Sequence, residues 1–283
     1  ELQRARAHIA ARNSYGVDLN PLATELGKVS LWLNVLRPGA RAPFFDPRIQ
    51  AGNSLVGARR TWYPRDRLNK ASKKDGDNWL KVEPQTGKRP ADGVWQFLLF
   101  AEGMADFAND KVVKGLVPEA TEHIKAWQKT LNRTWSAAER SRLAKLSDRV
   151  DELWAQHEAA RKAALAACTP AASVWPEPDV PDADDRDEAE LARAWAQAEA
   201  ANGAGRRLKR LLDLWCSLWF WPLAEAERLP DRSDWLADVD TVLSGRPPVE
   251  GTPSAERLRV AGDVADRHRF IHWEWAFPEV SAR

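Results

Sequence analysis

Residues 15–36 read YGVDLNPLATELGKVSLWLNVL and contain the clearest structural signal of the chain. Tyr15 to Leu19 form a short apolar run that predicts a buried strand, which Asn20-Pro21 ends. Pro21 suits the first turn of a helix. Apolar residues then recur at steps of four and three, the spacing of one helix face. They are Leu22, Leu26, Val29, Leu33 and Leu36.

A second strand is predicted at residues 48–52, RIQAG, after Pro38-Gly39 ends the helix. Strand, helix and strand in about 40 residues form a βαβ unit, which requires a parallel sheet. Upstream, Leu2, Ala5 and Ile9 keep a helical spacing, so the chain is expected to start inside a helix. Residues 1–57 are therefore assigned to a partial α/β unit.

The residues that follow change character twice. Between Arg59 and Arg89, ten Lys or Arg residues stand against four Asp or Glu without any period. Residues 58–92 therefore predict a long, mobile, basic loop. Residues 93–256 predict a mainly helical insertion with a solvated acidic linker at 176–190.

Two apolar patterns mark the helical insertion, and a third follows it. A seam stepping by three, four and three predicts a short coiled-coil-like helix. Its members are Leu143, Leu146, Val150 and Leu153. The run LLDLWCSLWFW at 211–221 must be buried or lie at an interface. Residues 257–283 predict a helix and then a strand, because apolar residues alternate over 270–280. The expected fold class is α/β with a large α-helical insertion.

Composition excludes several functional classes. The 283 residues carry 42 Lys and Arg against 41 Asp and Glu, so no charge excess indicates a polyanionic partner. No apolar run approaches the roughly 18–20 residues that span a bilayer, and no secretory leader opens the chain. Two cysteines provide neither a disulfide framework nor a four-cysteine zinc site. We expect a soluble, cytoplasmic protein without membrane partners.

Asp18 is the candidate binding residue of the α/β unit, and two interpretations of it are open. A carboxylate at the carboxyl end of a strand in a nucleotide-binding sheet accepts hydrogen bonds from ribose hydroxyls. Alternatively, Asp18 only begins a turn with Asn20-Pro21, as Asp commonly does.

Three segments resemble large adenine-N6 DNA methyltransferases, above all the phage-defence enzymes of BREX (PglX-like) and DISARM systems and fused restriction–modification enzymes. Residues 16–33, beginning GVDLNPLA, are similar to the second motif of this family. Residues 49–55, IQAGNSL, resemble its third motif. Residues 269–280, RFIHWEWAFPEV, resemble the stretch just before its catalytic loop.

The resemblance implies a partial Rossmann-like methyltransferase sheet, with the βαβ start and a C-terminal strand, that binds S-adenosylmethionine. It implies that Asp18 binds the ribose hydroxyls of this cofactor, that Leu19 flanks its adenine ring, and that Asn53 lies near the adenine amino group. Asn53 replaces the usual Asp of the family and brings no charge. Asn20 is suited to cap the helix that follows.

Two parts of the family pattern are missing from these residues. No Gly-rich first motif precedes residue 16, and no Asn-Pro-Pro-aromatic loop follows residue 280. The only double proline, Pro247-Pro248, lacks both the preceding Asn or Asp and the following aromatic residue. Base flipping and amino-group binding need that loop, so we assign no catalytic residue. The chain, which begins with Glu1, is expected to be an internal, inactive part of a methyltransferase.

The basic loop is the candidate contact for double-stranded DNA, because phosphate contacts position a protein without reading sequence. The candidate residues are Arg59, Arg60, Arg65, Arg67, Lys73 and Lys74. The alternative is a solvated insertion without a ligand. For the whole chain, the alternative to an enzyme is a non-catalytic helical interaction module or scaffold subunit. It would use 211–221 and the 143–153 seam as interfaces, with other subunits of a defence system as partners. We assign no metal site.

Overall fold

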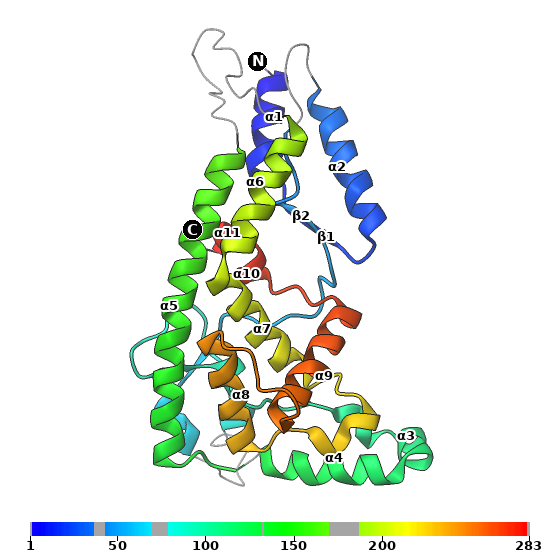
Figure 1. Ribbon diagram of the computed structural model, residues 1–283, viewed down its shortest axis with the longest axis vertical. Helices are drawn as coiled ribbons and strands as arrows, with labels where there is room; N and C mark the ends of the chain where they lie inside the picture. Colours follow the sequence, from blue (N-terminus) through cyan, green and yellow to red (C-terminus); the bar gives the residue numbers. More distant parts are fainter. Residues whose placement is uncertain (1, 37–42, 70–78, 132, 170–186, 282–283) are drawn as a thin grey trace.

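The computed structural model describes residues 2–36, 43–69, 79–131, 133–169 and 187–281, and most of them are helical (Figure 1). The strands are β1 (Gly16–Asp18), β2 (Ile49–Ala51), β3 (Trp62–Pro64) and β4 (Gly93–Trp95). The α-helices are α1 (Leu2–Asn13), α2 (Pro21–Val35), α3 (Lys111–Leu116), α4 (Pro118–Leu131), α5 (Ala137–Cys168), α6 (Glu188–Ala201), α7 (Gly203–Ser217), α8 (Arg232–Ser244), α9 (Pro253–His268), α10 (Trp273–Ala276) and α11 (Pro278–Ser281). Short 3₁₀ turns are η1 (Arg65–Asn69), η3 (Trp79–Lys81), η4 (Gln96–Leu98), η5 (Asp106–Asn109) and η6 (Leu223–Arg228).

The predicted βαβ unit is confirmed. β1 and β2 pair in parallel, with Gly16 opposite Ile49 and Asp18 opposite Ala51. Asn20 caps α2, because its side chain accepts a hydrogen bond from the Leu22 N–H at 2.9 Å. Pro21 occupies the first turn, where its missing N–H leaves no hydrogen bond unmade. The strand, its stop signal and the helix start therefore follow from local sequence.

Helix α2 forms as predicted, but the apolar stripe that predicted it faces outward. Leu22 is 65% exposed, Leu26 59% and Leu33 58%. The packed face of the helix instead presents Leu31 and Val35 to α1, β2 and the loop before β2. This face contacts a small cluster that contains Ala10, Phe45 and Ile49. An apolar stripe along most of α2 thus stays exposed in the described structure.

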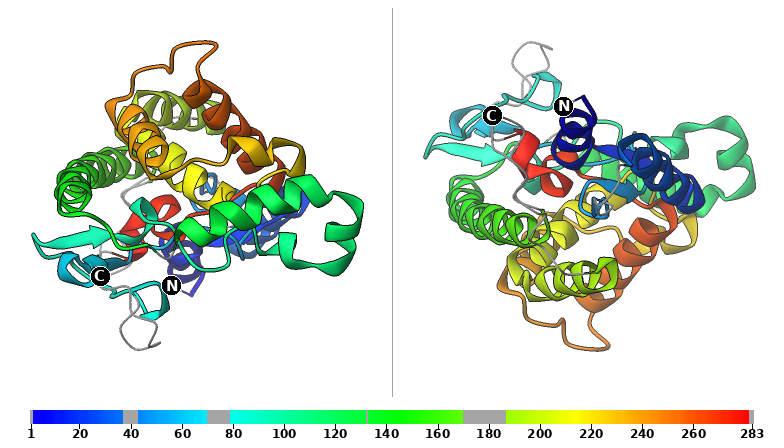
Figure 2. Two further views of the ribbon diagram at one scale, coloured as in Figure 1. Left: turned by 90° about the horizontal axis from the view of Figure 1, so that it is seen from below. Right: turned by 90° about the horizontal axis from the view of Figure 1, so that it is seen from above.

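The main core is built by helices around α7, which packs against α5, α8 and α9 (Figure 2). The predicted seam on α5 is buried, since Leu143 and Val150 have no exposed surface and Leu146 and Leu153 very little. The helix itself is not short as predicted, because α5 has 32 residues. Within 211–221, Leu211, Trp215, Leu218 and Trp221 are all buried in the same cluster. Tryptophans reach backbone acceptors inside this core: Trp215 Nε1 donates to Leu99 O and Trp235 Nε1 to Leu98 O, both at 2.7 Å.

The prediction of a mobile basic loop at 58–92 is wrong for the described residues. β3 pairs antiparallel with β4, and the aromatic residues Trp62, Tyr63 and Trp79 are 9%, 5% and 1% exposed. Arg89 donates to Asp148 at 2.6 Å and to Asp151 at 2.9 Å, both on α5, and fixes the end of the segment. The positive charge of residues 58–92 is therefore partly neutralised by carboxylates that are distant in sequence. Lys73 and Lys74 lie outside the described residues.

The predicted C-terminal strand is also wrong. Phe270 makes one isolated parallel bridge with Asn53, and the chain then turns into α10 and α11. These helices cover the second face of the small sheet, where Ile271 and Phe277 cluster with Val17. The described fold is mostly helical with two small two-stranded sheets, one parallel and one antiparallel.

Most of the predicted acidic linker, residues 176–186, lies outside the described residues, and α6 begins at Glu188. Among the helices described, none combines the length and apolar character that crossing a membrane requires.

Candidate functional site at the carboxyl ends of β1 and β2

The parallel register brings the three predicted cofactor residues to one edge of the sheet. Asp18 ends β1, and its carbonyl accepts a hydrogen bond from the Gly52 N–H at 2.8 Å just beyond β2. Asn53 follows directly. Because carboxyl ends of parallel strands share an edge, Asp18, Leu19 and Asn53 lie together at the edge where nucleotide ligands bind in open α/β sheets.

Asp18 is exposed and makes the turn that one interpretation predicted. Its Oδ1 accepts a hydrogen bond from the Asn20 N–H at 2.8 Å. Among the described residues, no group donates to Oδ2. One carboxylate oxygen thus holds the turn while the other is available to a ligand, so the two interpretations of Asp18 are compatible.

Asn53 is held by the backbone on both sides. Its N–H donates to the Arg269 carbonyl at 2.7 Å, and its Oδ1 accepts from the Leu55 N–H at 3.1 Å. The side-chain amide N–H groups of Asn53 have no hydrogen-bond acceptor among the described residues, and Oδ1 keeps a second lone pair. Leu19, which follows Asp18 in the chain, is 57% exposed.

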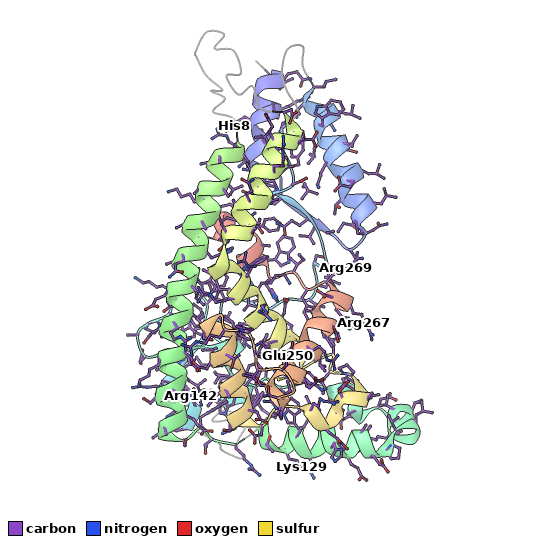
Figure 3. All side chains as sticks on the ribbon, in the orientation of Figure 1. His8, Lys129, Arg142, Glu250, Arg267 and Arg269 are labelled. Atoms are coloured by element: carbon purple, nitrogen blue, oxygen red, sulfur yellow. The ribbon has the colours of Figure 1, made fainter. Side chains whose placement is uncertain are left out.

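Arg269 links the two strand ends to α9, a role with no signal in the sequence (Figure 3). It adopts a left-handed conformation with φ of 52°, which is uncommon for a residue with a side chain. Its N–H closes α9 on Ala265, its carbonyl accepts from Asn53, and its Nη1 donates to the Leu19 carbonyl at 3.1 Å. Such backbone strain persists where surrounding contacts impose it.

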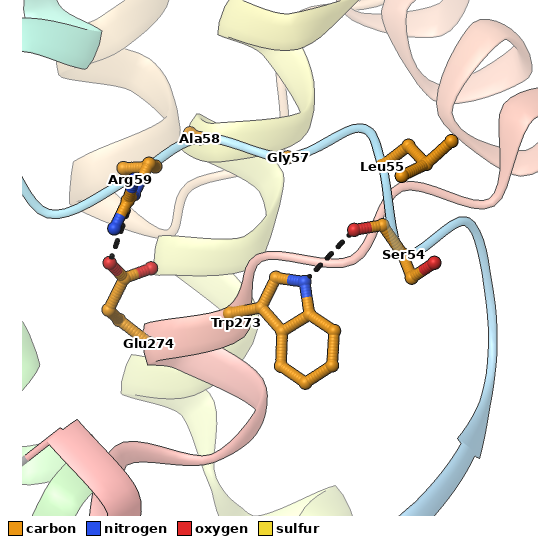
Figure 4. A pocket seen from close by; sticks show the side chains of 7 residues that line it. All are labelled: Ser54, Leu55, Gly57, Ala58, Arg59, Trp273 and Glu274. Carbon is orange, nitrogen blue, oxygen red and sulfur yellow. Dashed lines mark hydrogen bonds and ion pairs between the residues drawn. The ribbon is translucent and has the colours of Figure 1, made fainter. Parts of the chain in front are cut away.

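A hollow of about 230 Å³ opens beyond Asn53. It is lined by Ser54, Leu55, Gly57, Ala58, Arg59, Trp273 and Glu274 (Figure 4). Trp273 Nε1 donates to the Ser54 carbonyl at 3.0 Å, and Arg59 Nε lies 3.7 Å from Glu274 Oε1. The hollow therefore lies between the loop after β2 and the start of α10.

His272 supports the floor of this hollow. Its Nδ1 accepts from the Ala58 N–H at 2.9 Å, so Nε2 carries the proton and donates to Asp213 Oδ1 at 3.0 Å. The role of His272 here is thus structural, and Asp213 on α7 is its partner. Burial lowers the pKa of His272, although the hydrogen bond to Asp213 opposes that effect.

We expect the buried His272 to make folding sensitive to acid. The pKa of His272 in the folded protein lies below the value of about 6.5 for unfolded chains, so its contribution is complete above that pH. As pH falls below about 6.5, the unfolded state takes up the proton first, and the free energy of unfolding falls by up to about 1.4 kcal/mol per pH unit.

Urea unfolding at several pH values between 7.5 and 5 measures this slope. His272→Gln is expected to show a shallower slope than the wild type, whereas His123→Gln, at a half-exposed position on α4, leaves it unchanged. Equal slopes in all three proteins would contradict the assignment.

The predicted DNA-binding residues differ in availability. Arg59 has a side chain that is 76% exposed, and Arg65 is exposed at the start of η1, whereas Arg67 is half-buried. The guanidinium carbon of Arg60 lies 4.7 Å from the Trp154 ring centroid, and its Nη1 donates to Glu158 at 2.6 Å. Arg60 therefore contributes to packing against α5.

Comparison with known proteins gives no match: no family model, curated protein or solved structure corresponds to this chain. Among the described residues, no three His, Cys, Asp or Glu side chains gather closely enough to hold a metal ion. Both cysteines are buried, and burial raises the pKa of the Cys216 thiol, which keeps it protonated and unreactive.

Proposed function

We propose that this chain is part of an adenine-N6 DNA methyltransferase of a phage-defence or restriction system and forms part of its S-adenosylmethionine site. The observation that supports this proposal most is the gathering of Asp18, Leu19 and Asn53 at the carboxyl edge of a parallel pair. These are the residues for which the sequence resemblance implies cofactor contacts.

The donor and acceptor groups present fit an adenosyl group. Asp18 Oδ2 offers a charged acceptor for ribose hydroxyls, and exposed Leu19 offers an apolar surface for the adenine ring. The Asn53 amide group offers a donor and its Oδ1 a remaining acceptor for the purine edge. S-adenosylmethionine, when bound, supplies the sulfonium-activated methyl group.

Methyl transfer itself is proposed for the complete protein of which these residues are a part. The chain contains neither a Gly-rich turn before β1 nor an Asn-Pro-Pro-aromatic segment to hold a flipped adenine. What these residues do in the proposal is bind and orient the adenosyl end of the cofactor. Orientation of that kind raises a transfer rate by fixing the geometry of approach.

The proposal includes double-stranded DNA as the second ligand. Exposed Arg59 lines the hollow beside the strand ends, and exposed Arg65 follows β3. Positive charge at such positions supports phosphate contacts, which lose affinity as salt is raised.

The alternative is a helical interaction module, and the surfaces predicted for it are not exposed. Residues 211–221 and the α5 seam are packed inside the core of this chain. The outward apolar stripe of α2 is the described surface that still favours an interaction role.

Asp18→Asn tests the proposed cofactor site in the product of the complete reading frame. Asparagine keeps the acceptor that holds the turn with Asn20 but removes the charge, so the fold is expected to persist. Hydrogen bonds to a charged acceptor contribute about 1.5–3 kcal/mol, so S-adenosylmethionine affinity is expected to fall at least about tenfold.

Isothermal calorimetry gives the affinity, and thermal denaturation gives the cofactor-dependent stabilisation, which shrinks in parallel. Glu25→Gln, an equal charge change at an exposed position on α2, is the matched control and should bind like the wild type. A wild-type protein that binds no S-adenosylmethionine, or an Asp18→Asn variant that binds it normally, would sink the proposal.

A further inference from the structure

Trp273 is one of two tryptophans in the described residues with an exposed side chain, and Trp32 on α2 is the other. It is 43% exposed, whereas Trp79, Trp95, Trp135 and Trp235 are at most 1% exposed. Leaving a large aromatic surface in water forgoes its hydrophobic stabilisation. An exposed aromatic ring in a concave site is therefore a candidate ligand contact.

The ring of Trp273 is held in place although it is exposed. Its Nε1 donates to the Ser54 carbonyl at 3.0 Å, and its centroid lies 5.6 Å from that of Phe277 at an interplanar angle of 48°. Figure 4 shows the indole beneath Ser54, at the start of α10. A ring fixed at two points loses little conformational freedom when it binds a ligand.

The position of the ring connects it to the strand ends. Ser54 and Leu55 follow Asn53 directly, and both line the hollow together with Trp273. Leu55 is 92% exposed and Leu19 57%, so exposed apolar side chains follow Asn53 and Asp18 closely in the chain. This combination of apolar walls and few polar groups is typical of sites that bind a planar, hydrogen-bonding ring.

We infer that Trp273 is a positioning residue that stacks on the adenine ring of the adenosyl cofactor. The inference rests on the proposed function, because Asp18 and Asn53 orient the same adenosyl group. Stacking of an aromatic side chain on a base does not require exact polar contacts, because it depends on the flat faces of both rings. The Ser54 carbonyl keeps the indole in the orientation that stacking requires.

The test compares two ligands in the product of the complete reading frame. S-adenosylhomocysteine carries the base, and S-ribosylhomocysteine carries the ribose and amino acid without it. Trp273→Ala is expected to weaken S-adenosylhomocysteine about tenfold and to leave S-ribosylhomocysteine unchanged. Trp273→Phe retains an aromatic face and should lose less than about threefold, whereas Trp273→Leu should resemble Trp273→Ala.

Trp32→Ala is the matched control, since Trp32 is 37% exposed and lies on α2 roughly 16 Å along the helix from Pro21. If the wild type binds neither ligand, the proposed function itself fails. If Asp18→Asn weakens both ligands while Trp273→Ala weakens neither, only the stacking inference fails. Equal weakening of both ligands by Trp273→Ala would indicate a structural role and would overturn the inference. A loss confined to DNA affinity would also overturn it.

Discussion

Replacing Asp238 by alanine is expected to lower the free energy of unfolding by about 3–5 kcal/mol, the range for breaking a buried ion pair. Asp238 on α8 has no exposed surface, and its Oδ2 accepts from Arg257 Nε at 2.6 Å. Its Oδ1 accepts from Arg257 Nη2 at 3.1 Å and from Ser254 Oγ at 2.5 Å. Arg257 is 6% exposed, so among the described residues the variant leaves this nearly buried guanidinium with Asp234, at 3.2 Å, as its remaining ion-pair partner.

Urea unfolding of both proteins at pH 7 measures this difference. Asp240→Ala is the matched control, because Asp240 lies on the same helix, is half-exposed, and pairs with Arg149 at the surface. Surface pairs contribute at most about 1 kcal/mol. The double variant Asp238→Leu, Arg257→Met removes both charges and should recover most of the loss. Equal losses for Asp238→Ala and Asp240→Ala would contradict the importance of the buried pair.

The βαβ unit could be predicted from the sequence because its signals are local. Asn20-Pro21 ends the strand and caps α2 within three residues, and the parallel register then places Asp18 near Asn53. The direction of the α2 stripe could not be predicted, because periodicity identifies a face without saying what covers it. Leu31 and Val35 are packed, and the more regular stripe faces outward.

The two wrong predictions share a physical origin in long-range partners. The excess of basic residues at 58–92 predicted a solvated loop, but some of their counterions lie elsewhere in the chain. Arg89 is paired with Asp148 and Asp151, about 60 residues later. Alternation over 270–280 indicated a strand, yet a short apolar run fits a buried helical turn equally well. His272 precedes α10, and its hydrogen bond to Asp213 holds this residue in the interior.

Only part of the candidate site could be predicted from the sequence, because the other part depends on long-range contacts. Asp18, Leu19 and Asn53 follow strands, and this is a pattern that sequence carries. Arg269 and Trp273 enter the site from a segment about 215 residues further along, through the Asn53 N–H and the Ser54 carbonyl. The resemblance of residues 269–280 associates this segment with the same family core, but no local pattern predicts these two contacts.

Replacing Gly57 by alanine is expected to destabilise the protein by about 3 kcal/mol and to disturb the hollow. A Cβ at Gly57 would lie 1.9 Å from the carbonyl oxygen of Ile271 and 2.7 Å from its carbonyl carbon. Both are backbone atoms that no rotamer change can move, so overpacking must separate the two segments. Their separation would break the hydrogen bonds from Ile271 N to Val56 O and from Ala58 N to His272 Nδ1.

Gly262→Ala is the matched control, because a Cβ there meets no atom within 4 Å in the middle of α9. Alanine is the better helix former by about 1 kcal/mol, so this variant should gain stability while Gly57→Ala loses it. Thermal and urea unfolding give the sign and size of both changes. In the complete protein, Gly57→Ala should also weaken S-adenosylhomocysteine, because Ala58, Arg59 and Trp273 line the same hollow. If Gly57→Ala is as stable as the wild type, residues 56–58 and 271–272 do not pack against each other as described. That result would also contradict the position of Trp273, which follows this contact in the chain.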